Sequence, residues 1–165
     1  MTQVPLSQVR IQACLMDETM AAFQFADPDF EARVRASFGR QRIMEAIGAS
    51  LSRVAPGEVQ IDLPIRDILT QQHGYVHAGI VTAIADSACG YAALTLLPSG
   101  TEVLTVEYKV NFLAPARGTR LVACGRVIRP GRTIAVCRGE VSAVDGTTRV
   151  VVASMLATMI RSKPT

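Results

Sequence analysis

The sequence has no tryptophan, and its three tyrosines and five phenylalanines make up only 5% of its 165 residues. It also has no zinc-finger or helix-turn-helix signature, and its basic residues mostly stand singly between apolar ones. Domains that bind nucleic acid usually combine such a motif with clustered basic residues. We therefore expect no nucleic-acid partner.

Residues that bind metals are scarce as well. The only histidines are His73 and His77, and neither has acidic or thiol partners at the spacing of metal ligands, so we expect no metal site. The four cysteines form no C-x-x-C pair and lie among small apolar residues, which is typical of buried free thiols in a reducing compartment: Cys14, Cys89, Cys124 and Cys137.

A hydrophobic run of the membrane-spanning kind is also missing. The most apolar stretch, residues 78–97, contains Asp86 and is rich in alanine, glycine, serine and threonine, which favours a buried helix of a globular protein. The first ten residues carry Pro5 and polar side chains in place of a basic and then apolar leader. We expect a cytoplasmic protein with no secretory signal and no membrane partner.

One long stretch lacks acidic residues. Residues 1–31 carry five acids and one arginine, and the formal net charge of the whole chain is +3. Between Glu107 and Glu140 every charged residue is basic: Lys109, Arg117, Arg120, Arg126, Arg129, Arg132 and Arg138. Such a stretch fits a phosphorylated ligand or an anionic surface, and it also fits solvated strand ends that bind nothing.

The chain does have enough apolar material for one domain, because 49% of its residues are hydrophobic and 19% are charged. We expect residues 28–165 to form this domain and residues 1–27, with a short helix over 16–25, to be an accessory segment. Periodicity predicts helices over 28–47 and 78–97 and strands over 51–54, 58–65, 103–113, 119–129, 132–144 and 148–160.

The boundaries of these elements carry their own signals. Asp27 is the expected N-cap and Pro28 the first residue of the first helix, which Gly48 ends. Short turns between the last four strands require antiparallel neighbours. The helix over 78–97 is apolar nearly all round and must be enclosed. A curved antiparallel sheet wrapped around it gives an α+β fold of the hotdog type.

Asp86 is the single ionisable residue of the predicted central helix. Burying a lone carboxylate costs several kcal/mol unless it is paired, so Asp86 is a candidate catalytic residue, with anchoring of a neighbouring backbone as the alternative. At the start of the helix, the N–H groups of Ala78 and Gly79 point outward where the helix dipole favours negative charge. They form a candidate oxyanion hole, although Gly79 could instead serve only tight packing.

These two features lie far apart on one helix. Ala78 and Asp86 are eight residues apart, which corresponds to roughly 12 Å along the axis, and His77 and Asp86 lie on opposite sides. If both serve one reaction, Asp86 must come from a second copy of the chain. The sequence then implies a two-fold dimer with two equivalent sites at its interface.

Several runs resemble a known family, the hotdog-fold acyl-CoA thioesterases of the phenylacetate-degradation (PaaI-like) group. The runs that carry the resemblance are Gln71–Gly79, Ala85–Ala88, Gly90–Ala93, Val106–Ala116 and Gly131–Arg132. The resemblance implies an enzyme without a cofactor that hydrolyses an acyl-CoA thioester to an acid and coenzyme A. Aromatic, hydroxylated aromatic and medium-chain acyl groups all fit this sequence.

The resemblance also implies residue roles. Asp86 corresponds to the catalytic carboxylate, as general base or as nucleophile. Gln71 corresponds to the residue that helps to place the reacting carbonyl or water, and the N–H of Ala78 or Gly79 to the oxyanion donor. Thr105 stands where relatives carry a hydroxyl that assists the attacking water.

One position departs from the family pattern. Relatives usually have His-Gly-Gly where this chain has His77-Ala78-Gly79, and a backbone donor survives this change if its conformation is helical. We expect His77 to orient the loop by a hydrogen bond. His73 is expected to be a loop residue.

The resemblance implies a ligand for the basic stretch between Glu107 and Glu140. Arginines bind phosphates in two-pronged contacts, so Arg129 and Arg132 are expected to meet the phosphates of coenzyme A, with Arg117 and Arg126 as further candidates. Relatives often pair two dimers, which implies a tetramer. Two alternatives remain open: a hotdog dehydratase or hydratase that uses His77 with Asp86, and a non-catalytic module that binds acyl-CoA.

Overall fold

The computed structural model describes residues 26–163, so Cys14 and the helix expected over residues 16–25 lie outside the described residues. The helices are α1 (Phe30–Phe38), α2 (Arg42–Ile47), the short 3₁₀ helix η2 (Asp67–Leu69) and α3 (Ala78–Leu94). The strands are β1 (Ser50–Ala55), β2 (Glu58–Pro64), β3 (Glu102–Phe112), β4 (Arg120–Arg129), β5 (Ile134–Asp145) and β6 (Thr148–Ser162).

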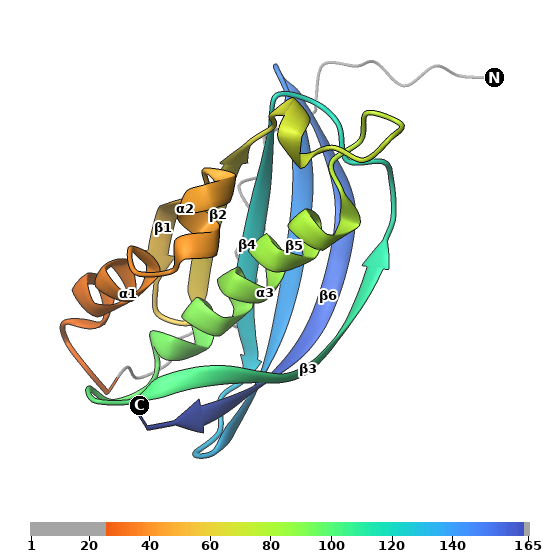
Figure 1. Cartoon of the computed structure of the whole chain (residues 1–165). Coiled ribbons are helices and arrows are strands. Elements are labelled where there is room, and N and C mark those ends of the chain that lie inside the picture. The colour runs from red at the N-terminus through yellow and green to blue at the C-terminus, as the bar shows by residue number, and fades with distance from the viewer. Residues whose placement is uncertain (1–25, 164–165) are drawn as a thin grey trace, which may run out of the picture.

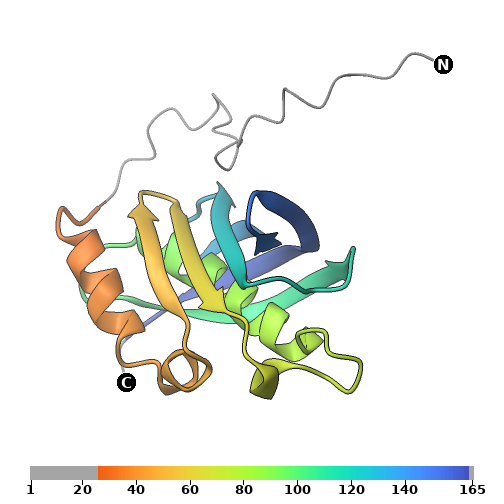
Figure 2. The ribbon, with the colours of Figure 1, turned by 90° about the horizontal axis from the view of Figure 1, so that it is seen from above.

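The six strands form one antiparallel sheet in the order β1-β2-β4-β5-β6-β3. The sheet curves around α3, which crosses its concave side (Figures 1 and 2). The hotdog fold predicted from the sequence is therefore confirmed. Among the described residues, no helix is long and apolar enough to cross a membrane.

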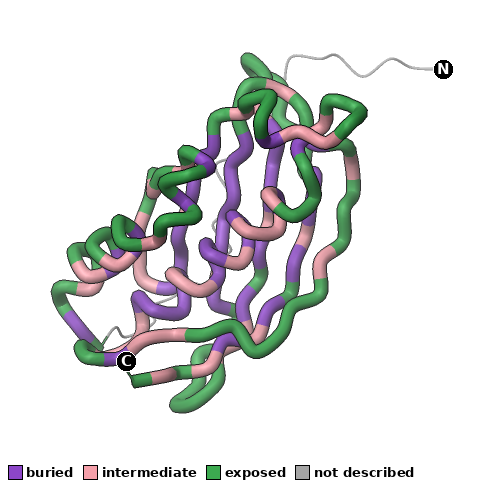
Figure 3. Tube along the Cα trace, in the orientation of Figure 1, coloured by how far each residue is buried: buried purple, intermediate pink, exposed green. Residues whose placement is uncertain are grey.

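Two glycines let α3 lie close to the sheet. Gly125 on β4 pairs with Gly139 on β5, both beneath the middle of α3. A Cβ atom at Gly125 would lie 2.2 Å from the backbone carbon of Ala88, and one at Gly139 would lie 3.0 Å from Sγ of Cys89. Buried residues accordingly concentrate on α3 and on the central strands beneath it (Figure 3). Because α3 is fixed this closely, the position of Asp86 is fixed with it.

The single helix expected over 28–47 is wrong in two respects. It begins at Phe30, since the Asp27 carboxylate accepts the N–H of Asp29 at 3.0 Å and does not cap the helix. It also breaks between α1 and α2, in residues 39–41. Phe38 and Met44 are both buried, yet six residues of straight helix would place them about 120° apart around the helix axis. The break lets both side chains enter the core.

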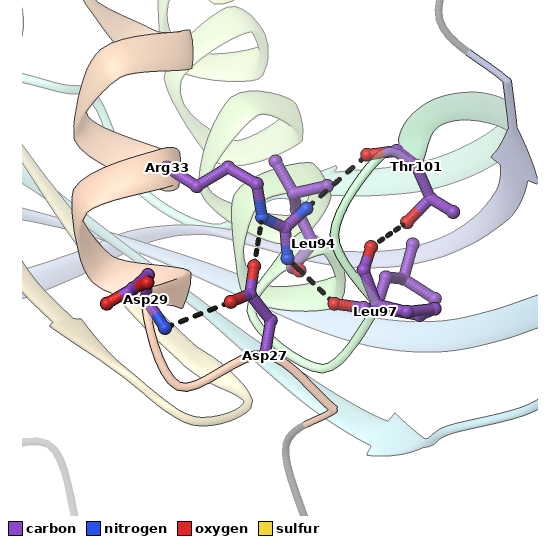
Figure 4. Close-up of polar contacts among 7 residues, drawn as sticks. Asp27, Asp29, Arg33, Leu94, Leu97 and Thr101 are labelled. Atoms are coloured by element: carbon purple, nitrogen blue, oxygen red, sulfur yellow. Dashed lines mark hydrogen bonds and ion pairs between the residues drawn. The ribbon is translucent and has the colours of Figure 1, made fainter.

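Arg33 ties α1 to the far end of α3 (Figure 4). Its guanidinium pairs with Asp27 at 2.8 Å and donates to the carbonyl oxygens of Leu94 and Leu97 at 3.2 and 2.7 Å. A cation is favourable at this end because helix carbonyls carry partial negative charge there. Of the segment 1–27, which the sequence predicts to be accessory, Asp27 is thus attached to the domain.

The predicted end of α3 at residue 97 is three residues too late. Oγ1 of Thr95 donates to the carbonyl of Ala92 and accepts the N–H of Gly57, both at 2.7 Å. This side chain takes part in bonds that end the helix at Leu94 and anchor it to the β1–β2 turn. The strand boundaries agree with the prediction within about two residues.

The strand β3 is more exposed than the half-buried strand that alternation predicts, because it forms an edge of the sheet. A bulge between Thr105 and Glu107 also shifts the alternation by one residue. Thr105 and Tyr108 therefore both pair with residues of β6 that are buried against α3, whereas Leu104 lies on the convex face. The bulge turns the Thr105 side chain toward α3.

Candidate active site

Asp86 lies in the middle of α3 and is half-buried. Its Oδ1 accepts a hydrogen bond of 2.8 Å from Oγ1 of Thr105 on β3. Thr105 is exposed, so the pair can be reached from outside the single chain. The two residues come from elements that are distant in sequence and that the fold holds side by side.

The net effect of the surroundings of Asp86 is to raise the pKa of its carboxyl group. Burial removes water from the carboxylate and raises its pKa above the ordinary value of aspartate, while the hydrogen bond from Thr105 lowers it. No arginine, lysine or histidine within residues 26–163 forms an ion pair with Asp86. A half-buried carboxylate that no cation neutralises can act as a general base or as a nucleophile.

The start of α3 presents one free backbone donor. His77 is the N-cap, and its Nδ1 accepts the N–H of Gly79 at 2.9 Å, which assigns the proton of a neutral ring to Nε2. The N–H of Ala78 has no acceptor among the described residues. Of the two backbone donors expected from the sequence, Gly79 is thus bonded to His77, whereas Ala78 is not bonded within the described residues.

Gln71 lies in the loop that leads into α3. Its backbone N–H donates to the carbonyl of Tyr75 at 2.8 Å, and its Oε1 accepts the N–H of His73. Gly74 closes the loop with a φ of 77°, a conformation that favours glycine. In the single chain the Gln71 side chain thus bonds to its own loop, near the start of α3.

One chain does not bring all the candidate residues together. Gln71 lies in the loop before α3, and His77, Ala78 and Gly79 lie at the start of this helix. Asp86 lies in its middle, bonded to Thr105. The helix is continuous from Ala78 to Leu94, so about 12 Å of axial rise separates Ala78 from Asp86. Within one chain, the two groups of candidate residues therefore lie apart.

The arginines expected to bind phosphate have different surroundings. Arg126 pairs with Glu58 at 2.9 Å, and the other oxygen of this buried carboxylate pairs with Arg53, also at 2.9 Å. Arg126 is therefore engaged within the fold. Arg129 and Arg132 are exposed at the end of β4 and in the β4–β5 turn.

Ser87, the residue after Asp86, makes a contact that could not be predicted from the sequence. The buried Ser87 lies 3.3 Å from Nε2 of Gln41, the residue at which the chain re-enters a helix after the break between α1 and α2. The contact holds the middle of α3 against this break. Periodicity places Gln41 inside a continuous helix, which explains why the contact could not be anticipated.

The thiols of Cys89, Cys124 and Cys137 are buried and form no disulfide with one another, as the sequence predicts. Burial raises the pKa of Cys137 to about 12 and that of Cys89 well above its ordinary value, which makes both poor nucleophiles. Within residues 26–163, no three His, Cys, Asp or Glu side chains lie close enough together to hold a metal ion. Among the described residues, the candidate reactive groups are therefore the Asp86 carboxylate and the groups at the start of α3.

Several known proteins that resemble this chain are described as esterases or thioesterases. The family model of the thioesterase superfamily matches residues 73–150. The chain is 31% identical over 125 residues to a candidate esterase of Halobacterium salinarum, covering 73% of this chain and 81% of that protein. It is 23% identical over 121 residues to the 1,4-dihydroxy-2-naphthoyl-CoA hydrolase of Listeria monocytogenes, covering 73% of this chain and 97% of that one.

A solved structure is similar over nearly its whole length. It is a thioesterase family protein from Silicibacter pomeroyi, 43% identical, with a TM-score of 0.80, covering 82% of this chain and 99% of that one. Both the fold and the sequence of residues 73–150 thus have thioesterase relatives.

Proposed function

This chain belongs to the thioesterase superfamily, and from that premise we propose that it hydrolyses an acyl-CoA thioester to a carboxylic acid and coenzyme A. The observation that carries the proposal is the Asp86–Thr105 pair. A carboxylate on a core helix, bonded to a hydroxyl and to no cation of the described chain, lies at the surface left uncovered in the single chain.

The reaction follows from these groups. As a general base, Asp86 takes a proton from water while the water oxygen attacks the thioester carbon. As a nucleophile, a carboxylate oxygen attacks that carbon and forms an anhydride, which water then opens. In both routes charge develops on the thioester oxygen, the C–S bond breaks, and coenzyme A leaves as a thiolate that takes up a proton.

The developing oxyanion needs a donor, which we assign to the N–H of Ala78 at the start of α3. His77 supports this role by binding the N–H of Gly79 and fixing the first turn. Gln71, in the preceding loop, would orient the carbonyl or the water. The dipole of α3 adds favourable potential at the same point.

We propose that Asp86 and Thr105 of one subunit act with Gln71, His77 and Ala78 of the other in a homodimer. β3 is an edge strand of 11 residues and carries several exposed apolar side chains. Those that are between 45% and 61% exposed are Leu104, Val106, Tyr108 and Phe112. Such an edge tends to pair with another strand, and antiparallel pairing of β3 with its own copy would form a two-fold dimer next to Thr105.

Further assembly and substrate contacts are part of the same proposal. The exposed Arg129 and Arg132 would bind the phosphates of coenzyme A. Two dimers would associate into a tetramer.

An aromatic acyl group is supported by the named substrate of the Listeria relative. Membership of the PaaI-like group is supported by the sequence runs around residues 71–93.

A dehydratase in which His77 and Asp86 share the chemistry is less well supported. Nδ1 of His77 already accepts the N–H of Gly79, so the ring is held as a cap. A non-catalytic module that binds acyl-CoA is the remaining alternative, and turnover measurements distinguish it.

The test measures release of coenzyme A from a panel of aromatic and aliphatic acyl-CoA thioesters, with the signal from the protein's own thiols subtracted. We expect turnover of at least one substrate and a loss of roughly 100-fold or more in Asp86→Asn. Asp145→Asn, the same chemical change in the exposed β5–β6 hairpin, serves as the control and should retain activity. Binding of acyl-CoA without turnover would identify a binding module.

A further inference from the structure

Gly90 is a glycine inside a regular helix, one turn after Asp86 in α3. Glycine is less favourable than alanine at such a position, because it gives up more conformational freedom on folding. A Cβ atom built at Gly90 would meet no atom of the described chain within 4 Å. Within the described chain, nothing therefore prevents a larger residue at this position.

The other glycines of the chain have local reasons to lack a side chain. A Cβ atom would lie between 2.2 and 3.1 Å from a neighbouring atom at Gly79, Gly118, Gly125, Gly131 and Gly139. A positive φ is found at Gly48, Gly57, Gly74, Gly100 and Gly146. Gly39 follows the last residue of α1 and forms its C-cap. Gly90 alone has neither a special backbone conformation nor a close neighbour.

Gly90 and Asp86 lie on the same side of α3. Residues four apart in a helix are neighbours on one face, about 5–6 Å apart. Ala88, two residues from each of them, packs its backbone on Gly125 of β4, and two residues correspond to about 200° of rotation. Gly90 and Asp86 therefore lie opposite the side that packs on β4, and both are half-buried. The open space at Gly90 is next to the carboxylate and accessible in the single chain.

The surroundings of this space suit the apolar part of a substrate. After Asp86, the rest of α3 carries no charged side chain, since residues 87–94 are Ser-Ala-Cys-Gly-Tyr-Ala-Ala-Leu. In the proposed reaction, the thioester carbon lies against Asp86, and two branches leave this carbon. The coenzyme A branch carries phosphates, which need basic side chains or water. The acyl group is the branch that matches an uncharged helix surface.

The missing side chain also determines the size of the group that fits. Without a Cβ atom at Gly90, a ligand can lie directly on the backbone of the helix, which is a common use of glycine in binding sites. An acetyl group has one carbon beyond the carbonyl and stays close to Asp86. A ring-sized group bridges the distance of about 5–6 Å between the two positions.

We propose that Gly90 opens the binding space for the acyl group, so that a ring-sized apolar acyl group lies against the backbone of α3 one turn after Asp86. The residue at position 90 then sets the largest acyl group that the site accepts. This assignment rests on the proposed thioester hydrolysis for the position of the reacting carbon. It gives Gly90 a role in specificity and none in proton transfer.

Gly90→Leu fills the space, and two substrates test the effect. Release of coenzyme A from benzoyl-CoA and from acetyl-CoA is measured for the wild type and the variant. We expect kcat/KM to fall about tenfold or more for benzoyl-CoA and to change less than about threefold for acetyl-CoA. Gly39→Leu, which adds the same side chain at an exposed helix end, is the matched control and should change neither value. No loss, or equal losses for both substrates, would overturn the proposal.

Binding separates this assignment from the catalytic proposal. S-benzyl-coenzyme A and S-methyl-coenzyme A are thioethers that cannot be hydrolysed, and calorimetry measures their Kd values. Gly90→Leu should weaken the benzyl compound about tenfold or more and the methyl compound less than about threefold. This result without turnover of any thioester would disprove hydrolysis and support the role of Gly90. Turnover with equal effects on both compounds would support hydrolysis and overturn the role of Gly90.

The oligomeric state shows whether a second chain fills the space instead. We expect Gly90→Leu and the wild type to have the same oligomeric state in sedimentation velocity over about a hundredfold dilution. A change of state in Gly90→Leu would mean that a partner subunit packs against position 90, and would overturn the assignment.

Gly90→Ala decides the matter if Gly90→Leu does not fold. Alanine favours the helix and meets no described neighbour, so we expect Tm to rise by about 2–4 °C. The ratio of kcat/KM for benzoyl-CoA to that for acetyl-CoA should nevertheless fall about threefold or more. A lower Tm or an unchanged ratio would overturn the proposal.

Discussion

The hydroxyl of Thr105 on β3 donates a hydrogen bond of 2.8 Å to Oδ1 of Asp86 on α3. This bond joins the central helix to the edge strand that would pair with a second subunit. It also opposes the effect of burial on the carboxylate, because it stabilises the ionised form. The protonation of Asp86 therefore depends on a residue of the proposed dimer edge.

Replacing Thr105 by valine should shift the acidic limb of the plot of kcat/KM against pH. If Asp86 acts in its ionised form, kcat/KM falls as pH decreases through its pKa. Thr105→Val removes the bond that lowers this pKa, so the limb should move to higher pH, whereas Thr105→Ser should keep it near the wild-type position. The measurement is kcat/KM against pH for the three proteins. A limb that stays in place in Thr105→Val would contradict the assigned role.

Deleting the backbone donor of Ala78 tests the oxyanion hole. Proline is tolerated as the first residue of a helix, and the preceding His77 has an extended ψ of 136°, as a residue before proline requires. Ala78→Pro should therefore keep the fold and remove only the N–H. We expect kcat to fall about 100–1000-fold, while Ala78→Gly, which keeps the donor, retains activity. Wild-type kcat in Ala78→Pro would exclude this donor.

The close approach of α3 to the sheet makes Gly125 intolerant of a side chain. Its Cβ would lie 2.2 Å from the backbone of Ala88, which cannot move without displacing α3. Gly125→Ala should lower the free energy of unfolding by about 2–3 kcal/mol or more. Gly39→Ala is the control, because Gly39 has a helical φ of −62° and its Cβ would meet nothing closer than 3.5 Å. Denaturant unfolding measures both changes.

Two arginines of α1 should differ in their effect on stability. Arg33 pairs with the buried Asp27 and binds the end of α3, whereas Arg35 pairs with Glu31 on the exposed side of the helix. Arg33→Met leaves a buried carboxylate unpaired and should cost about 3 kcal/mol. Arg35→Met should cost about 0.5 kcal/mol or less. Similar losses in the two variants would show that the Asp27 contact contributes little.

The architecture could be predicted from the sequence because the periodicity of apolar residues reflects it directly. The apolar stretch after His77 and the strands between short turns predict a helix inside an antiparallel sheet, and the structure has both. Asp86 stands out for the same reason, as a charge in an apolar helix. Its contact with Thr105 could not be read from alternation, since the bulge before Glu107 depends on the pairing of β3 with β6.

The errors lie where tertiary contacts override local pattern. A continuous helix over 28–47 is consistent with periodicity, but the chain breaks between Phe38 and Met44, and both side chains are buried. Asp27 looks like an N-cap in the sequence, yet Arg33 draws its carboxylate to the end of α3. Both outcomes depend on residues that are distant in sequence.

A mixed dimer tests the central claim, that each site takes Asp86 from one subunit and Ala78 from the other. Asp86→Asn and Ala78→Pro chains with different tags are co-expressed, the heterodimer is isolated, and its release of coenzyme A is compared with that of the wild type and of both parent homodimers. A shared site predicts that the heterodimer has one doubly altered site and one intact site, with about half of the wild-type kcat, while both parents are inactive. A heterodimer as inactive as its parents would contradict the account, because it would show that each site is built within one chain.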